Sequence, residues 1–193
     1  MNLIGRKVTL RAIEERDLEF LQNLMNDPNV SSTVVGTSFP VSALHQQHWY
    51  QRVVDDDRTL RLIVETKKDG VVGTVIMGDF DWVSRVAHST GIKLDTSRIT
   101  ESGIGLDAMI TLFDYAFNEL NLNRIEGSVM ADNRQAMALN RLIGYTVEGT
   151  MRQAVYRGGE YHDVLMLGML KEDFEKRHRR GKGLKKNGED SKS

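Results

Sequence analysis

Two glycines, Gly103 and Gly105, stand between a β-strand pattern and a long amphipathic helix pattern. The first turn of a helix presents unpaired N–H groups and a partial positive charge, and glycine lets a phosphate approach that backbone closely. The segment Ser102-Gly103-Ile104-Gly105 is therefore suited to hold a pyrophosphate. It lacks the Lys-Ser or Lys-Thr of a P-loop and the third glycine of the dinucleotide fingerprint. The alternative is a turn that merely leads the chain into a helix, and the pattern alone does not decide between the two.

Apolar periodicity places this turn within a mixed α+β fold. Strands are expected at residues 7–12, 60–66, 71–79, 86–94, 124–130, 145–157 and 160–170. Helices are expected at residues 17–27, 43–54, 104–120 and 134–142, with Asp17 and Ser42 as caps and residues 29–42 as a loop. The order β α α β β β α β α β β predicts an antiparallel front half followed by one strand–helix–strand crossover.

The composition describes one globular domain with a basic end. The chain has 193 residues, a net charge of −1 and no cysteine, which excludes disulfides, cysteine-ligated zinc and a cysteine nucleophile. Residues 176–193 carry eight Lys/Arg and two Asp/Glu, about +6, which leaves about −7 for residues 1–175. We therefore expect a folded domain at 1–175 and a disordered tail at 176–193 that is able to contact RNA or the ribosome weakly.

The start of the chain shows no signal-peptide pattern, and no apolar run approaches the roughly 20 residues that cross a bilayer. The expected location is the cytoplasm, with no membrane partner.

Several short segments resemble, in order and spacing, those of one enzyme family. They are Val8-Thr9-Leu10-Arg11-Ala12 with Asp17-Leu18, Val72-Gly73-Thr74-Val75, Gly103-Ile104-Gly105-Leu106-Asp107-Ala108, Leu122-Asn123-Arg124-Ile125-Glu126, Asp132-Asn133 with Ala136, Ile143-Gly144-Tyr145 with Glu148-Gly149, and Arg157-Gly158-Gly159-Glu160-Tyr161-His162-Asp163. Together they resemble the GNAT superfamily of acyl-CoA N-acyltransferases, most closely the branch of ribosomal-protein N-terminal and spermidine acetyltransferases. The resemblance implies a mixed, mostly antiparallel sheet with a V-shaped splay between two parallel strands, flanked by about four helices.

The same resemblance implies an acetyl-CoA site between strands 86–94 and 124–130. The pantetheine arm would pair with the end of the first strand, and the pyrophosphate would lie on the glycine turn. The implied cofactor-binding residues are Ile92, Lys93, Leu94, Ser102, Gly103, Ile104, Gly105, Leu106, Asn133, Asn140 and Arg141. For Asn133 a helix cap, and for Arg141 a solvated charge, are the alternatives.

The proton chemistry is where the chain departs from the family. The amine attacks the thioester directly, so the protein positions the reactants and removes a proton from the acceptor ammonium. Asn140 stands where many members of the family have a Tyr that acts as the acid. Ser89 stands near the position at which many members have a Glu. Unperturbed imidazole titrates near neutrality, which makes His88 a candidate base; an exposed strand histidine is the alternative. The catalytic candidates are His88, Ser89 and Asn140, and strand alternation predicts that only one of the first two faces the site.

Acceptor recognition is assigned to Trp49, Asp81 and Trp82, with core packing as the alternative for Trp49. His45 and His48 lack a third ligand, so no metal site is expected. The favoured acceptor is a protein N-terminal amine. Polyamines, amino sugars or antibiotic amines, and a non-catalytic CoA-binding sensor, are the alternatives, and a homodimer is considered.

Overall fold

The computed structural model describes residues 1–31, 35 and 39–178. Its elements are β1 (Leu3–Ile4), β2 (Val8–Ala12), the 3-10 turn η1 (Glu15–Asp17), α1 (Leu18–Asn26), α2 (Pro28–Ser31), α3 (Ala43–Val54), β3 (Thr59–Thr66), β4 (Gly70–Asp81), β5 (Val86–Leu94), α4 (Ile104–Asn118), β6 (Arg124–Met130), α5 (Arg134–Ile143), β7 (Thr146–Arg157), β8 (Glu160–Leu170) and α6 (Lys171–His178).

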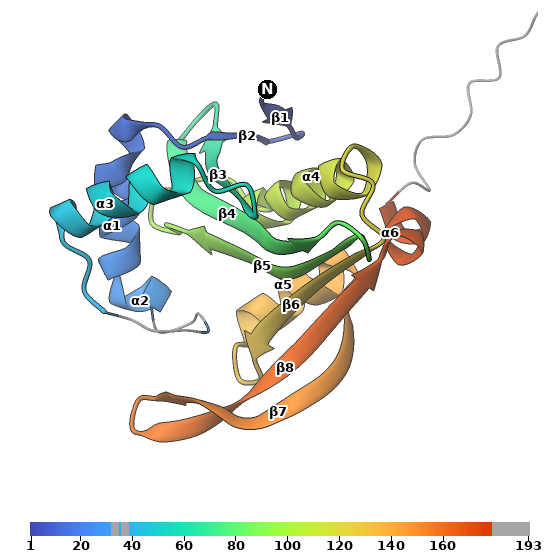
Figure 1. The fold of residues 1–193 in the computed structure, drawn as a ribbon. Helices are drawn as coiled ribbons and strands as arrows, with labels where there is room; N and C mark the ends of the chain where they lie inside the picture. Colours follow the sequence, from blue (N-terminus) through green and yellow to red (C-terminus); the bar gives the residue numbers. More distant parts are fainter. Residues whose placement is uncertain (32–34, 36–38, 179–193) are drawn as a thin grey trace, which may run out of the picture.

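One mixed sheet of eight strands organises the molecule, in the order β1-β2-β3-β4-β5-β6-β8-β7. Neighbouring strands are antiparallel except β5 and β6, which run parallel. This parallel pair is joined only at Val86–Arg124 and Ala87–Ile125, and beyond these residues the two strands separate (Figure 1). The V-shaped splay expected from the sequence is therefore confirmed.

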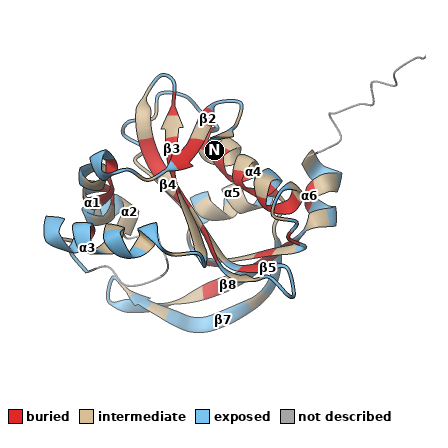
Figure 2. Ribbon diagram, turned by 45° about the horizontal axis from the view of Figure 1, so that its top comes forward, coloured by how far each residue is buried: buried red, intermediate tan, exposed pale blue. Residues whose placement is uncertain are grey.

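The core lies between the sheet and the C-terminal helices. Helix α4 buries a face at helical spacing, with Ala108, Leu112 and Ala116 fully covered, because this helix packs against β2 and β5. Figure 2 shows the buried positions concentrated in β2–β5 and α4, while the edge strand β7 is exposed along much of its length. The half of the sheet beyond the splay is thus less covered than the half before it.

Helix α6 closes the core at the C-terminal end. Phe174 is 1% exposed and packs against Phe113 and Phe117 of α4. Arg177 and His178 donate to the carbonyls of Leu142 and Ile143, which satisfies two acceptors at the end of α5. The folded part continues to His178, three residues beyond the predicted boundary at 175. Residues 179–193, which hold most of the predicted basic tail and its RNA contact, lie outside the described residues.

Several element predictions need correction. The described residues contain six α-helices rather than about four, because α2 lies in the region predicted as a loop and α6 was not predicted. The long helix ends at Asn118 rather than 120, β4 continues to Asp81 rather than 79, and β1 was missed. Asp17 does not cap α1 with its side chain, because its carboxylate binds the Arg11 guanidinium instead. Within the described residues, no helix is long and apolar enough to span a membrane.

Candidate acetyl-CoA and acceptor site

The splay leaves one edge of β5 without a strand partner. On its other side β5 stays paired with β4 as far as Leu94–Gly73, whereas its pairing with β6 ends at Ala87. From His88 to Leu94, the outward-facing backbone groups of β5 therefore meet no described strand. Such an edge accepts an extended chain as an additional strand. This geometry fits a pantetheine arm lying along Ile92, Lys93 and Leu94.

The side chains at this end of β5 point to both faces of the sheet. Ile92 and Leu94 pack against the core, while the Lys93 ammonium lies 3.1 Å from the Met25 sulfur of α1. Burial lowers the pKa of Lys93. Since its ammonium is directed toward α1, any contact of Lys93 with the pantetheine arm is made by its backbone.

The predicted phosphate turn lies directly beside the end of β5. Gly103 precedes α4 with a left-handed φ of +83°, a conformation that favours glycine. A Cβ on Gly105 would lie 3.2 Å from Leu94 Cδ1 and 3.8 Å from Leu139 Cδ2. The turn, the end of β5 and helix α5 therefore meet at Gly105, which brings the three predicted parts of the cofactor site together.

A lysine that the sequence did not single out holds this turn. Lys7 Nζ donates to the Ser102 carbonyl at 2.9 Å and pairs with Glu101 at 2.5 Å. Its backbone N–H donates to the Asp107 carboxylate in the first turn of α4, at 2.7 Å. Lys7 thus fixes the turn to β2 and adds a positive charge next to it.

Helix α5 carries the remaining cofactor candidates. The Oδ1 of Asn133 accepts the Ala136 N–H at 3.0 Å. Asn133 therefore caps α5, and its predicted role as a helix cap is confirmed. Asn140 is half-buried and Arg141 is exposed. Their contact with the cofactor stays a prediction.

A tyrosine hydroxyl, which the sequence did not predict, enters the splay. Tyr145 is stacked edge-on to Phe113 of α4, and its hydroxyl lies 2.7 Å from Thr90 Oγ1 on β5. Thr90 in turn donates to the Glu126 carbonyl on β6. Burial raises the pKa of Tyr145. The hydroxyl pair therefore bridges the two diverging strands.

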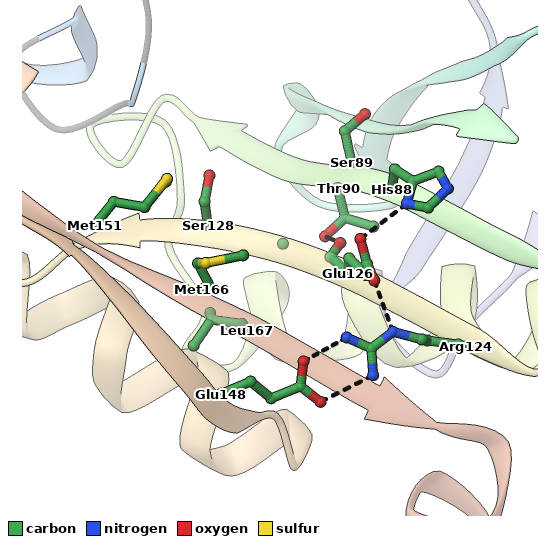
Figure 3. A pocket seen from close by; sticks show the side chains of 11 residues that line it. His88, Ser89, Thr90, Arg124, Glu126, Ser128, Glu148, Met151, Met166 and Leu167 are labelled. Carbon is green, nitrogen blue, oxygen red and sulfur yellow. Dashed lines mark hydrogen bonds and ion pairs between the residues drawn. The ribbon is translucent and has the colours of Figure 1, made fainter. Parts of the chain in front are cut away.

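A cavity of about 190 Å³ opens where the strands separate. We call it the splay pocket. It is lined by His88, Ser89, Thr90, Arg124, Glu126, Gly127, Ser128, Glu148, Met151, Met166 and Leu167 (Figure 3).

Four charged or titratable side chains form a chain across this pocket, from β5 to β7. His88 Nδ1 lies 2.9 Å from Glu126 Oε2, and Arg124 Nε donates to Glu126 Oε1 at 2.7 Å. The other two nitrogens of Arg124 donate to both oxygens of Glu148 (Figure 3). The hydrogen bond from Arg124 lowers the pKa of Glu148. Burial acts to raise the pKa of Glu126, but the hydrogen bonds from His88 and Arg124 outweigh it, so this pKa is also lowered. Both glutamates are therefore ionised at neutral pH.

His88 and Ser89 are both among the residues that line the splay pocket. The His88 side chain is directed at Glu126, whereas the Ser89 hydroxyl points away from it (Figure 3), so the prediction that at most one of the two faces the reacting groups stays a prediction. The pairs Gly78–Ser89 and Phe80–Ala87 flank this point, and Asp79 between them has a left-handed φ of +53°. The register between β4 and β5 is continuous through these pairs, so the side chains of β5 keep their alternation.

The three predicted acceptor residues lie elsewhere. Trp49 is half-buried on α3, and Trp82 is 54% exposed and stacked on Phe80. Asp81 accepts the N–H groups of Val83 and Ser84 and so shapes the β4–β5 turn. None of the three is among the residues that line the splay pocket, and their contact with an acceptor stays a prediction.

Comparisons with known proteins agree with this geometry. A family model described as an acetyltransferase (GNAT) domain matches residues 10–166. The chain belongs to the GNAT acetyltransferase family. It is an N-acetyltransferase that uses acetyl-CoA. That the open edge of β5 and the glycine turn bind this cosubstrate stays a prediction.

Two relatives and one structure illustrate the range of the family. The chain is 26% identical over 171 residues to a spermidine N(1)-acetyltransferase of Vibrio cholerae, covering 89% of this chain and 97% of the relative. It is 26% identical over 180 residues to a putative ribosomal N-acetyltransferase of Bacillus subtilis, covering 89% and 96%. A crystal structure of spermidine N-acetyltransferase from Vibrio cholerae in complex with CoA and spermine matches with a TM-score of 0.80 and 26% identity, covering 87% of this chain and 98% of that one.

Proposed function

We propose that this acetyltransferase acts on small aliphatic polyamines, and that the splay pocket receives the acceptor. The observation that carries the proposal is the combination of two ionised glutamates, Glu126 and Glu148, with the methionines Met151 and Met166 in one narrow cavity. Carboxylates bind ammonium groups, and flexible methionine side chains pack against methylene chains. A polyamine alternates ammonium groups with methylene chains. The similarity to a structure that contains CoA and spermine supports the same class of acceptor.

The pocket is poorly suited to an acceptor with a free carboxylate. Arg124 is the one cation among the residues that line it, and its guanidinium is already bonded to Glu126 and Glu148. A substrate carboxylate would therefore face two carboxylates without a free cation to bind it. Amino acids are therefore disfavoured as acceptors.

A protein N-terminal amine, which the sequence favoured, becomes the second choice. A peptide brings one ammonium and then neutral amide groups, so only one of the two carboxylates gains an ammonium beside its bond to Arg124. One relative is named a putative ribosomal N-acetyltransferase, so a peptide is tested as an acceptor beside the polyamine.

In the proposed reaction, acetyl-CoA supplies an activated acetyl group. The open edge of β5 aligns the pantetheine arm, and the first turn of α4 holds the phosphates at Gly103 to Leu106. On the acceptor side, the carboxylates orient the ammonium and His88 accepts its proton.

The experiment measures thiol release from acetyl-CoA with spermidine, an amino acid and a short peptide with a free N-terminus. We expect the highest kcat/KM with spermidine and a KM raised about tenfold in Glu148→Gln, which removes one ammonium partner. Glu172→Gln is the matched control, because Glu172 pairs with Lys176 on the surface of α6. Faster turnover of the peptide would overturn the polyamine proposal. CoA binding by calorimetry without turnover of any amine would overturn the catalytic role of the pocket.

A further inference from the structure

His88 and Glu126 occupy the vertex of the splay. The last paired residues of β5 and β6 are Ala87 and Ile125, so His88 and Glu126 are the next residues along each strand. Their side chains join across the opening, with Nδ1 of the imidazole 2.9 Å from Oε2 of the carboxylate. The contact is therefore placed at the point where the two strands begin to separate.

The charge of Glu126 determines which imidazole nitrogen carries the proton. An ionised carboxylate only accepts hydrogen bonds, so Nδ1 of His88 must be the donor. In the neutral ring the lone pair then lies on Nε2, which points away from Glu126 (Figure 3). The His88 side chain is 49% exposed, so an incoming acceptor is able to reach this nitrogen.

Arg124 keeps Glu126 in the ionised form. Its Nε donates to the second oxygen of Glu126 at 2.7 Å, so both carboxylate oxygens are bonded. The other two guanidinium nitrogens are bonded to Glu148. From β4, the Asp81 carboxylate also interacts with His88 through its charge, but its oxygen is bonded to backbone N–H groups of its own turn. Glu126 is thus the carboxylate that contacts the ring.

We propose that Glu126 is a positioning residue of acetyl transfer, which fixes His88 in the Nδ1–H tautomer so that Nε2 accepts the proton of the acceptor ammonium. The proposal rests on the proposed function. One proton passes from the ammonium to Nε2, which gives an imidazolium and a neutral amine with a free lone pair. The neutral amine then attacks the thioester carbon, the C–S bond breaks, and CoA leaves as its thiolate, which takes up the second proton that the amine nitrogen loses. The imidazolium returns the first proton to solvent, so the ring is restored after each turnover. Glu126 stays ionised throughout and stabilises the transient positive charge.

The test compares Glu126→Gln, His88→Gln and the double variant with the wild-type enzyme. Glutamine keeps the shape of Glu126 but removes the charge, so the ring loses its preference for the Nδ1–H tautomer. We expect kcat to fall at least about tenfold in each single variant, with little further loss in the double variant, because both changes disable one unit. Nitrogen NMR of the His88 ring in the cofactor-free protein should show the Nδ1–H form in the wild type and a mixture in Glu126→Gln.

Glu148→Gln is the matched control, because it removes a carboxylate from the same pocket and the same arginine without touching His88. It should alter KM while keeping the Nδ1–H tautomer. If Glu126→Gln keeps the wild-type tautomer and the wild-type kcat, the proposal is overturned even if amines are acetylated. If the wild type acetylates no amine, the proposed function fails separately, and an Nε2–H ring in the wild-type spectrum would still overturn the role of Glu126.

Discussion

Leu94 at the end of β5 and Gly105 in the first turn of α4 pack so closely that a Cβ on the glycine would lie 3.2 Å from Leu94 Cδ1. This contact places the helix N-terminus beside the unpaired edge of β5. The predicted phosphate turn and the strand predicted to hold the pantetheine arm therefore pack directly against each other. A substitution at Leu94 or at Gly105 is therefore expected to displace the other residue.

The charge of the phosphate turn gives the first prediction. Asn and Asp both tolerate the left-handed φ of +83° at Gly103, and they differ mainly in charge. Gly103→Asp places a carboxylate where the phosphates are expected, so CoA affinity should fall at least about tenfold below that of Gly103→Asn. Calorimetric titration with CoA makes the comparison. Equal affinities in the two variants would show that this turn only leads the chain into α4.

The second prediction separates the two roles of Asn133. Asn133→Ala removes the α5 cap and should lower the free energy of unfolding by about 1 kcal/mol. Ser42→Ala is the matched control, because Ser42 caps α3 through the His45 N–H at 3.1 Å. Both variants should lose similar stability in urea unfolding, and only Asn133→Ala should also weaken CoA binding. A loss of CoA affinity of the same size in Ser42→Ala would attribute the effect to stability.

Elements with clear end signals could be predicted from the sequence. Helix α3 and strands β5 and β6 have the predicted bounds, because a serine cap, a connecting turn and apolar periodicity mark them. Helix α6 was missed because Phe174 is its one buried residue and the rest of the segment is charged. Sequence periodicity carries no signal for a helix held by a single anchor.

The two halves of the site differ in the same way. The predicted cofactor half depends on backbone geometry, so glycines and a capping asparagine indicate it in the sequence. The proposed acceptor half depends on contacts between β5, β6 and β7, such as Arg124 with Glu148 and His88 with Glu126, which is 38 residues away in sequence. Such contacts follow from strand order and register, which no local pattern specifies.

The third prediction concerns the ion pair that replaces the expected Asp17 cap. Arg11 donates to both Asp17 oxygens at 2.7 and 2.8 Å, and the two side chains are only 10% and 3% exposed. Arg11→Met should destabilise the fold by about 3 kcal/mol, because it leaves a buried carboxylate without its partner. Lys176→Met, which breaks the exposed pair with Glu172, should cost far less stability, because solvent screens this pair. The double variant Arg11→Met/Asp17→Leu should recover much of the loss in urea unfolding. A double variant as unstable as Arg11→Met would contradict this account.

The fourth prediction is a pH dependence of stability at His162. Its Nδ1 lies 2.7 Å from an Asp132 carboxylate oxygen and its Nε2 lies 3.0 Å from the Arg157 carbonyl. Both partners only accept hydrogen bonds, so both ring nitrogens donate when the imidazole is protonated. The Arg157 carbonyl, followed by Asp132, raises the pKa of His162 above its usual value. The contribution to stability is therefore fully present below the unfolded pKa of about 6.5 and is lost as the pH rises through the higher folded value.

Urea unfolding of the wild type and His162→Gln at several pH values between about 5.5 and 8.5 measures this contribution. The difference in unfolding free energy should be largest at the acid end and shrink toward the alkaline end. Asp132→Asn is the control, because it keeps a hydrogen-bond acceptor but removes the charge. The difference in unfolding free energy between Asp132→Asn and His162→Gln should therefore depend less on pH than the difference between the wild type and His162→Gln. A wild-type advantage that stays constant across the whole range would mean that the ring is held by packing and not by its proton.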